Sequence, residues 1–71
     1  MFTISFSSLE KSQLLELNTA LKLCNVSMVE AEVKNTEVGY FVTIDISKEK
    51  TIEVFAHIPS IESSLIHIWA K

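Results

Sequence analysis

The chain has very little of three residue types that often dictate the structure of a small protein. Its 71 residues include one Cys, one Gly and one Pro. A single thiol excludes an intrachain disulfide, and no Cys/His pair has the spacing of zinc ligands. So little Gly and Pro leaves no flexible linker, low-complexity tract or repeat. We therefore expect one domain, residues 1–71, whose stability depends on its hydrophobic core, on a partner, or on both.

Basic residues are also scarce, since six Lys and no Arg leave a net charge of −3. A nucleic-acid-binding protein normally shows a basic stripe, so direct nucleic-acid binding is not expected. No apolar run approaches the ~20 residues of a membrane span. The start, MFTISFSS, lacks the basic segment of a signal peptide. Together with the single thiol, these features favour a cytoplasmic protein with no membrane partner.

Apolar side chains, in contrast, are abundant. They make up 48% of the residues, and the mean hydropathy is +0.31. A domain of this size has a small interior, so some of these side chains are expected near the surface. Contacts with a partner or with a second copy of the chain are the natural use of them.

The first third of the chain predicts a strand followed by a helix. Residues 2–6 alternate between apolar and polar, as in a half-buried strand. Residues 7–10 form a capping-box pattern that starts a helix ending near Leu23. Asn25 is expected in the left-handed conformation that terminates the helix, with Val26 packed back on it. The apolar face of this helix comprises Leu9, Leu14, Leu17, Ala20, Leu21 and Cys24.

The middle of the chain predicts further strands. Residues 26–34 alternate in polarity, and a two-residue turn at Asn35-Thr36 would connect them to a strand at 38–47. A loop at 48–50 would then lead into a strand at 51–58. In this register apolar residues face apolar residues on one side of the sheet, which is the condition that fixes a register.

The C-terminal segment, PSIESSLIHIWAK, is compatible with two structures. As a helix it has Ser60 as the N-cap and a shared apolar face, whereas as a strand its LIHIWA stretch is rich in β-formers. The cap and the spacing favour the helix. The predicted fold is therefore α+β: a small antiparallel sheet in the order β-α-β-β-β, then a short C-terminal helix or strand, with one amphipathic helix packed on one face. The β-α-β-β order resembles half of a ferredoxin-like unit in topology only, and that topology hosts many functions.

No pattern of side chains indicates catalysis or metal binding. Cys24 falls at the negative end of the predicted helix, which disfavours a thiolate, and it lies on the apolar face, so we expect a buried structural thiol. His57 and His67 belong to no metal-binding motif. The chain has no nucleophile elbow and no glycine-rich phosphate loop. We therefore expect neither an enzyme nor a cofactor.

The second face of the predicted sheet is the best indication of a function. The alternation places Phe41 and Phe55 on this face, together with His57 and several carboxylates. Aromatic anchors surrounded by polar groups are typical of protein–protein interfaces. The candidate partner-binding residues are Met28, Glu30, Phe41, Asp45, Glu53, Phe55 and His57. The alternative is that the tail covers this face as a second layer. Trp69, the only Trp, is expected to close the core.

These features predict a small, stand-alone, non-enzymatic protein-binding module. It would be an inhibitor or regulator that docks a larger protein through the acidic and aromatic face, with the carboxylates steering it toward a basic surface. Phage anti-defence proteins, antitoxins and immunity proteins share this general profile. The alternative is a homodimeric regulatory or ligand-sensing α+β domain.

Overall fold

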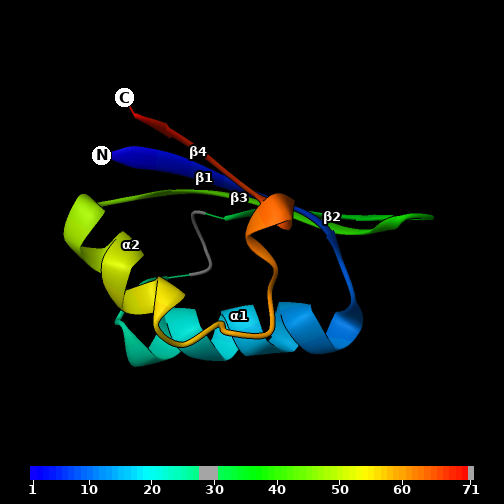
Figure 1. Cartoon of the computed structure of the whole chain (residues 1–71), viewed down its shortest axis with the longest axis horizontal. Helices are drawn as coiled ribbons and strands as arrows, with labels where there is room; N and C mark the ends of the chain where they lie inside the picture. The colour runs from blue at the N-terminus through cyan, green and yellow to red at the C-terminus, as the bar shows by residue number, and fades with distance from the viewer. Residues whose placement is uncertain (28–30, 71) are drawn as a thin grey trace.

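The computed structural model describes residues 1–27 and 31–70. Its elements are β1 (Phe2–Leu9), α1 (Lys11–Leu23), β2 (Glu32–Thr36), β3 (Gly39–Ile46), α2 (Lys48–Phe55), the 3-10 helix η2 (Ser63–Leu65) and β4 (Ile66–Ala70). The strands form one antiparallel sheet in the order β2-β3-β1-β4. Both α1 and α2 lie on the same side of this sheet (Figure 1). The predicted α+β class is confirmed, and the β-α-β-β-α-β order is that of a ferredoxin-like unit.

The hydrophobic core lies between the helices and one face of the sheet. Alternation along β1 and β3 sends every second side chain into it, as the period of a strand requires. The helices supply the opposite wall with buried Leu17, Ala20 and Leu21 from α1 and Val54 from α2. The sheet supplies Ile4, Phe6, Val42, Ile44 and Ile46.

The helix α1 starts later than the sequence predicts. The strand β1 continues to Leu9, because a register shift between Phe6 and Leu9, with Ser8 at φ 55, carries the chain past the predicted cap. Glu10 is the N-cap instead, and its backbone N–H donates to Gln13 Oε1 at 2.8 Å. The capping box therefore exists three residues further along.

The end of α1 is as predicted. Asn25 has φ 58, in the left-handed region. Its N–H donates to the Lys22 carbonyl at 3.1 Å, and the Val26 N–H donates to the Leu21 carbonyl at 2.8 Å. This pair of bonds is a Schellman motif, which satisfies carbonyls that the helix leaves without an internal partner.

The β2–β3 hairpin turns at Glu37-Val38 rather than at Asn35-Thr36. Thr36 pairs with Gly39, and its hydroxyl donates to the Gly39 carbonyl at 2.9 Å and accepts from the Val38 N–H at 3.2 Å. The Thr36 side chain thus stabilises the turn of the hairpin. Apolar pairing survives the change, since Val33 now faces Val42.

The strand predicted over residues 51–58 is wrong, because most of this segment is the helix α2. Ser47 is its N-cap and accepts from the Lys50 N–H at 3.3 Å. Thr51, although 4% exposed, is satisfied by donating its hydroxyl to the Ser47 carbonyl at 2.8 Å. Ile52, which the strand would place in the core, is 66% exposed.

We expect the substitution Ser47→Ala to lower the free energy of unfolding by about 1 kcal/mol, because α2 loses its N-cap acceptor. The matched control is Ser12→Ala in the exposed first turn of α1, where alanine is the better helix former and no loss is expected. Urea denaturation of the two variants measures the difference. Equal midpoints for both would contradict the role of Ser47.

The tail is a strand, so the helix that the sequence favours is wrong. β4 pairs antiparallel with β1, with Ile68 facing Ile4 and Trp69 facing Thr3. Between α2 and β4 the chain buries Ile58 and Ile61 in the core. The tail therefore extends the sheet at its edge, and it does not lie across the second face.

Candidate functional site

One face of the sheet is free of cover within the described part of the chain, because α1 and α2 share the opposite side (Figure 1). We call it the open face. Strand alternation places on it the side chains that are out of phase with the core. These are Thr3, Ser5, Glu32, Lys34, Thr36, Phe41, Thr43, Asp45, His67 and Trp69.

The strand register arranges the open face in rows. One row runs from Asp45 through Thr3 to Trp69. The next runs across all four strands, through Glu32, Thr43, Ser5 and His67. A third contains Lys34 beside Phe41. Phe41 and Trp69 therefore lie in different rows, on strands separated by β1, with hydroxyl groups between them.

Aromatic rings are the largest groups on the open face. Trp69 is 54% exposed, and its ring lies 6.3 Å from that of His67 with an interplanar angle of 28°. Phe41 is half-buried and, with Ser5 and Thr43, lines a hollow of about 330 Å³. Such rings offer contact area at a low cost in conformational entropy, which makes Trp and Tyr frequent anchors in interfaces.

The charged groups of the open face have partners on the same face. Thr3 Oγ1 donates to Asp45 Oδ1 at 2.7 Å. Lys34 Nζ lies 3.6 Å from Glu32 Oε1, with both side chains about 70% exposed. An ion pair at this exposure contributes at most about 1 kcal/mol. The open face is thus a polar and aromatic surface rather than a strongly acidic one.

The structure divides the candidate residues between opposite sides of the sheet. Phe41 and Asp45 lie on the open face, as predicted. Glu53 and Phe55 lie on α2, and His57 lies in the turn after it, so all three are on the helix side. Their predicted place beside Phe41 is wrong, because it rested on a strand where the chain forms a helix. Met28 and Glu30 fall outside the described residues.

The helix-side candidates have other surroundings than those expected. Phe55 is half-buried and packs against the core. Glu53 Oε2 lies 3.3 Å from Lys50 Nζ on the same helix, and it does not face Asp45. His57 is exposed and cannot contact Phe41 across the sheet. Trp69, expected to close the core, is instead on the open face.

Some open-face residues were not among the candidates from the sequence. Thr3 and Ser5 were visible as the polar half of the first strand, but only the tertiary pairing of β1 with β3 brings them beside Phe41 and Asp45. His67 and Trp69 join them because the tail is a strand. The β-forming composition of LIHIWA was the available signal.

Metal-ligating side chains are not clustered in the described residues. Across 1–27 and 31–70, no group of three or more His, Cys, Asp or Glu is placed to hold a metal ion. Cys24 is 4% exposed, as expected for a structural thiol. No helix in the described part of the chain has the length and apolar character that crossing a bilayer requires.

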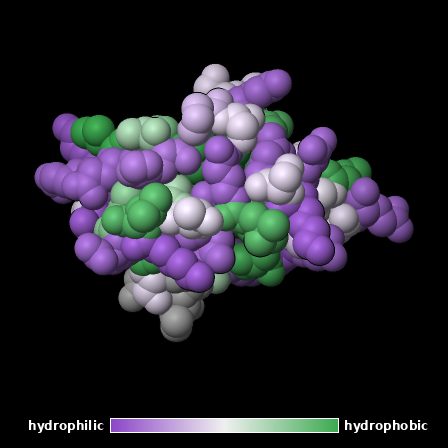
Figure 2. Space-filling view, turned by 90° about the horizontal axis from the view of Figure 1, so that it is seen from below, coloured by the Kyte–Doolittle hydropathy of each residue, from purple (hydrophilic) through white to green (hydrophobic). Residues whose placement is uncertain are grey.

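The helix side of the molecule differs from the open face. Figure 2 shows it as mainly hydrophilic, with separate hydrophobic patches. Leu15, Leu23 and Ile52 are exposed large apolar residues on its two helices, at 56%, 65% and 66%. Single exposed apolar residues of this kind are ordinary on a protein surface.

Comparison with known proteins gives this chain no relative: no protein-family model, no curated protein and no solved structure matches it.

Proposed function

We propose that this chain is a non-enzymatic protein-binding module, an inhibitor or regulator that docks a larger protein on the open face of its sheet. The observation that supports it is the pair of aromatic anchors, Phe41 and Trp69, on a face that no described element covers. The hydroxyls of Thr3, Ser5 and Thr43 lie between them, so the face combines apolar area with hydrogen-bonding groups. Interfaces are typically built this way.

The charge of the open face supports a protein partner over a nucleic acid. Lys34 is the only cation among its described residues, and it is paired with Glu32. Nucleic-acid binding needs several cations to replace the counterions of the phosphates. With a net charge of −3 on the whole chain, a partner with a basic surface is favoured during encounter.

The test is affinity capture from the cell of origin, with quantitative mass spectrometry. Removal of both anchors in Phe41→Ser/Trp69→Ser should lower the amount of each specifically captured protein at least tenfold. That factor requires a loss of only about 1.4 kcal/mol, less than one buried aromatic anchor commonly contributes. Circular dichroism confirms that the variant is folded.

The matched control is Leu15→Ser/Leu23→Ser, which removes two exposed apolar residues from the helix side. This control should capture the same proteins as the unchanged chain. The proposal is refuted if the folded open-face variant retains its captured proteins, or if the helix-side control loses them equally.

A further inference from the structure

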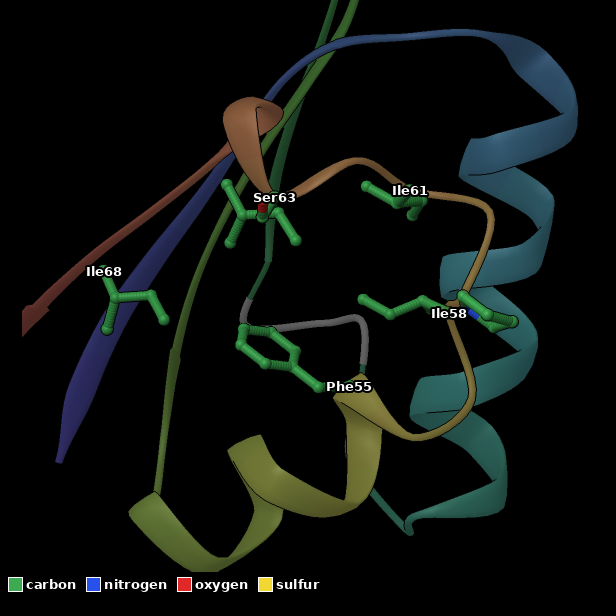
Figure 3. Close-up of a pocket in the computed structure, with 7 residues that line it drawn as sticks. Phe55, Ile58, Ile61, Ser63 and Ile68 are labelled. Atoms are coloured by element: carbon green, nitrogen blue, oxygen red, sulfur yellow. The ribbon is translucent and has the colours of Figure 1, made fainter.

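The outer edge of β4 lies beside an apolar groove. The groove has a volume of about 320 Å³, and Phe55, Ile58 and Ile61 line it from the helix side. Ile66 and Ile68 line it from the inner side of β4. In Figure 3, Phe55 points from the end of α2 into the space between the strand that carries Ile68 and the segment that carries Ile58 and Ile61. Ile68 is 46% exposed at this edge.

The two edges of the sheet differ in how they are protected against pairing. The edge strand β2 has the sequence EVKNT, with two charged residues and no buried position. The edge strand β4, IHIWA, has no Asp, Glu, Lys or Arg. Natural proteins usually protect an edge with charges, a Pro or a bulge, because its free N–H and C=O groups can pair with another strand. Within the described residues, β4 lacks these features.

The sequence of β4 is complementary to itself. In an antiparallel pair of two copies with Ile68 facing Ile68, Ile66 faces Ala70 and His67 faces Trp69. All five residues of each strand are then paired. A shift of one residue would place isoleucines against His67 and Trp69 and mix the two faces, whereas a shift of two leaves residues without a partner.

We propose that the occupant of the β4 edge is a second copy of this chain, joined by β4–β4 pairing about a two-fold axis at Ile68. The two sheets become one continuous sheet, with all helices on the same side. The pairing is isologous, so each copy contributes the same surface. This inference goes beyond the docking function, because it concerns the β4 edge and a second copy of the chain, although Trp69 belongs to both surfaces.

The energetic basis is the cover that each copy gives to the other. The partner's Ile66, Ile68 and Ala70 continue the apolar inner side of β4 over the mouth of the groove, which removes exposed apolar area from water. On the outer side, the stacked His67 and Trp69 of one copy meet those of the other. No charged side chain of the described edge is buried by the contact.

Sedimentation equilibrium tests the dimer with two matched variants. Val33→Lys and Ile68→Lys each place a charge at a β-branched residue on an edge strand, at similar exposures of 43% and 46%. The unchanged chain and Val33→Lys should approach twice the 8.0 kDa chain mass. Ile68→Lys should remain at the monomer mass. A monomeric unchanged chain at about 1 mM, or dimer loss in Val33→Lys alone, would overturn the proposal.

Disulfide trapping tests the register, and it does not depend on how a charged variant folds. In Ile68→Cys the two introduced thiols face each other at a separation suited to a disulfide, so oxidised glutathione should convert most of the protein to a covalent dimer. Trp69→Cys alone and Val33→Cys alone should form little covalent dimer. A mixture of Trp69→Cys and His67→Cys chains should cross-link, because these two positions face each other in the proposed pair. Cys24 is buried and is left in place. If Ile68→Cys forms no more covalent dimer than Val33→Cys, the pairing is refuted.

The outcomes also separate this proposal from the docking function. If the Ile68→Lys variant is monomeric and still captures its partner, docking is supported and does not require the dimer. The Phe41→Ser/Trp69→Ser variant is sedimented as well, because Trp69 faces His67 in the proposed pair. Loss of capture by a dimeric double variant is then a direct effect on the open face.

Discussion

The Phe6→Ala variant is expected to unfold at a much lower urea concentration than the unchanged chain. Phe6 is 1% exposed and heads the largest fully buried side chains of the described structure. It lies in the central strand β1, between Val42 of β3 and Ile66 of β4. Removing a buried Phe side chain typically costs about 3–5 kcal/mol, through lost transfer energy and the cavity left behind. A domain of this length has a total stability of about 4–10 kcal/mol, so the substitution removes a large fraction of it.

Phe41→Ala is the matched control, because it makes the same chemical change on the other side of the sheet. Phe41 is half-buried on the open face, and we expect a loss of about 1 kcal/mol or less. Urea denaturation followed by circular dichroism measures both. Similar losses for the two variants would show that the core is not confined to the helix side.

The second large effect is expected at Gly39. Gly39 has φ +119, a backbone conformation that side chains rarely adopt. A Cβ at this position would lie 2.9 Å from the Leu9 carbonyl oxygen and 2.9 Å from the Ser8 carbonyl carbon, both of them backbone atoms. Gly39→Ala should therefore cost at least about 2 kcal/mol, from backbone strain and from displacement of β1 at Ser8 and Leu9.

Val38→Ala provides the comparison for Gly39→Ala within the same turn. Val38 is 69% exposed, so its truncation should change the free energy of unfolding by no more than about 0.5 kcal/mol. Denaturation midpoints rank the two variants. A Gly39→Ala protein as stable as the Val38→Ala protein would mean that the hairpin end does not lie against the β1 backbone at Ser8 and Leu9.

Because both helices lie on one side of the sheet, the residues that stabilise the fold are separate from those of the proposed binding surface. The core is built from the side chains of β1 and β3 that face the helices. The side chains on the open face are therefore available for recognition. Phe41 and Trp69 can then contribute to binding without being needed for folding. This separation makes the open-face variants informative, because they are expected to remain folded.

Local patterns identified part of this architecture correctly. Alternation in residues 2–6 placed Ile4 and Phe6 in the core, and Asn25 ended α1 as expected. Phe41 and Asp45 were correctly assigned to the outer side of their strand. Each of these depends on a residue and its near neighbours, and such patterns are strong when an element is amphipathic.

The error at residues 51–58 came from a segment that fits two periods. Thr51, Val54, Phe55 and Ile58 have helical spacing, and Ser47 precedes them as a cap, yet the same stretch also alternates as a strand. The helix prevailed because the inner side of the sheet needs cover beside α1, and Thr51 and Val54 provide it when helical. Once this segment is helical, the second edge of β3 is free to pair with β1, and the tail pairs with the other edge of β1 as β4.

By itself, the amino-acid sequence determined the α+β class, the presence of α1 and its end, and the apolar side of β1 and β3, because these follow from the periodic pattern of neighbouring side chains. Only the tertiary structure decided the order β2-β3-β1-β4, the helical state of α2 and the place of Trp69 on the open face. Strand order and strand pairing join residues far apart in the chain. Their free energy depends on the packing of the whole domain, which no local pattern contains.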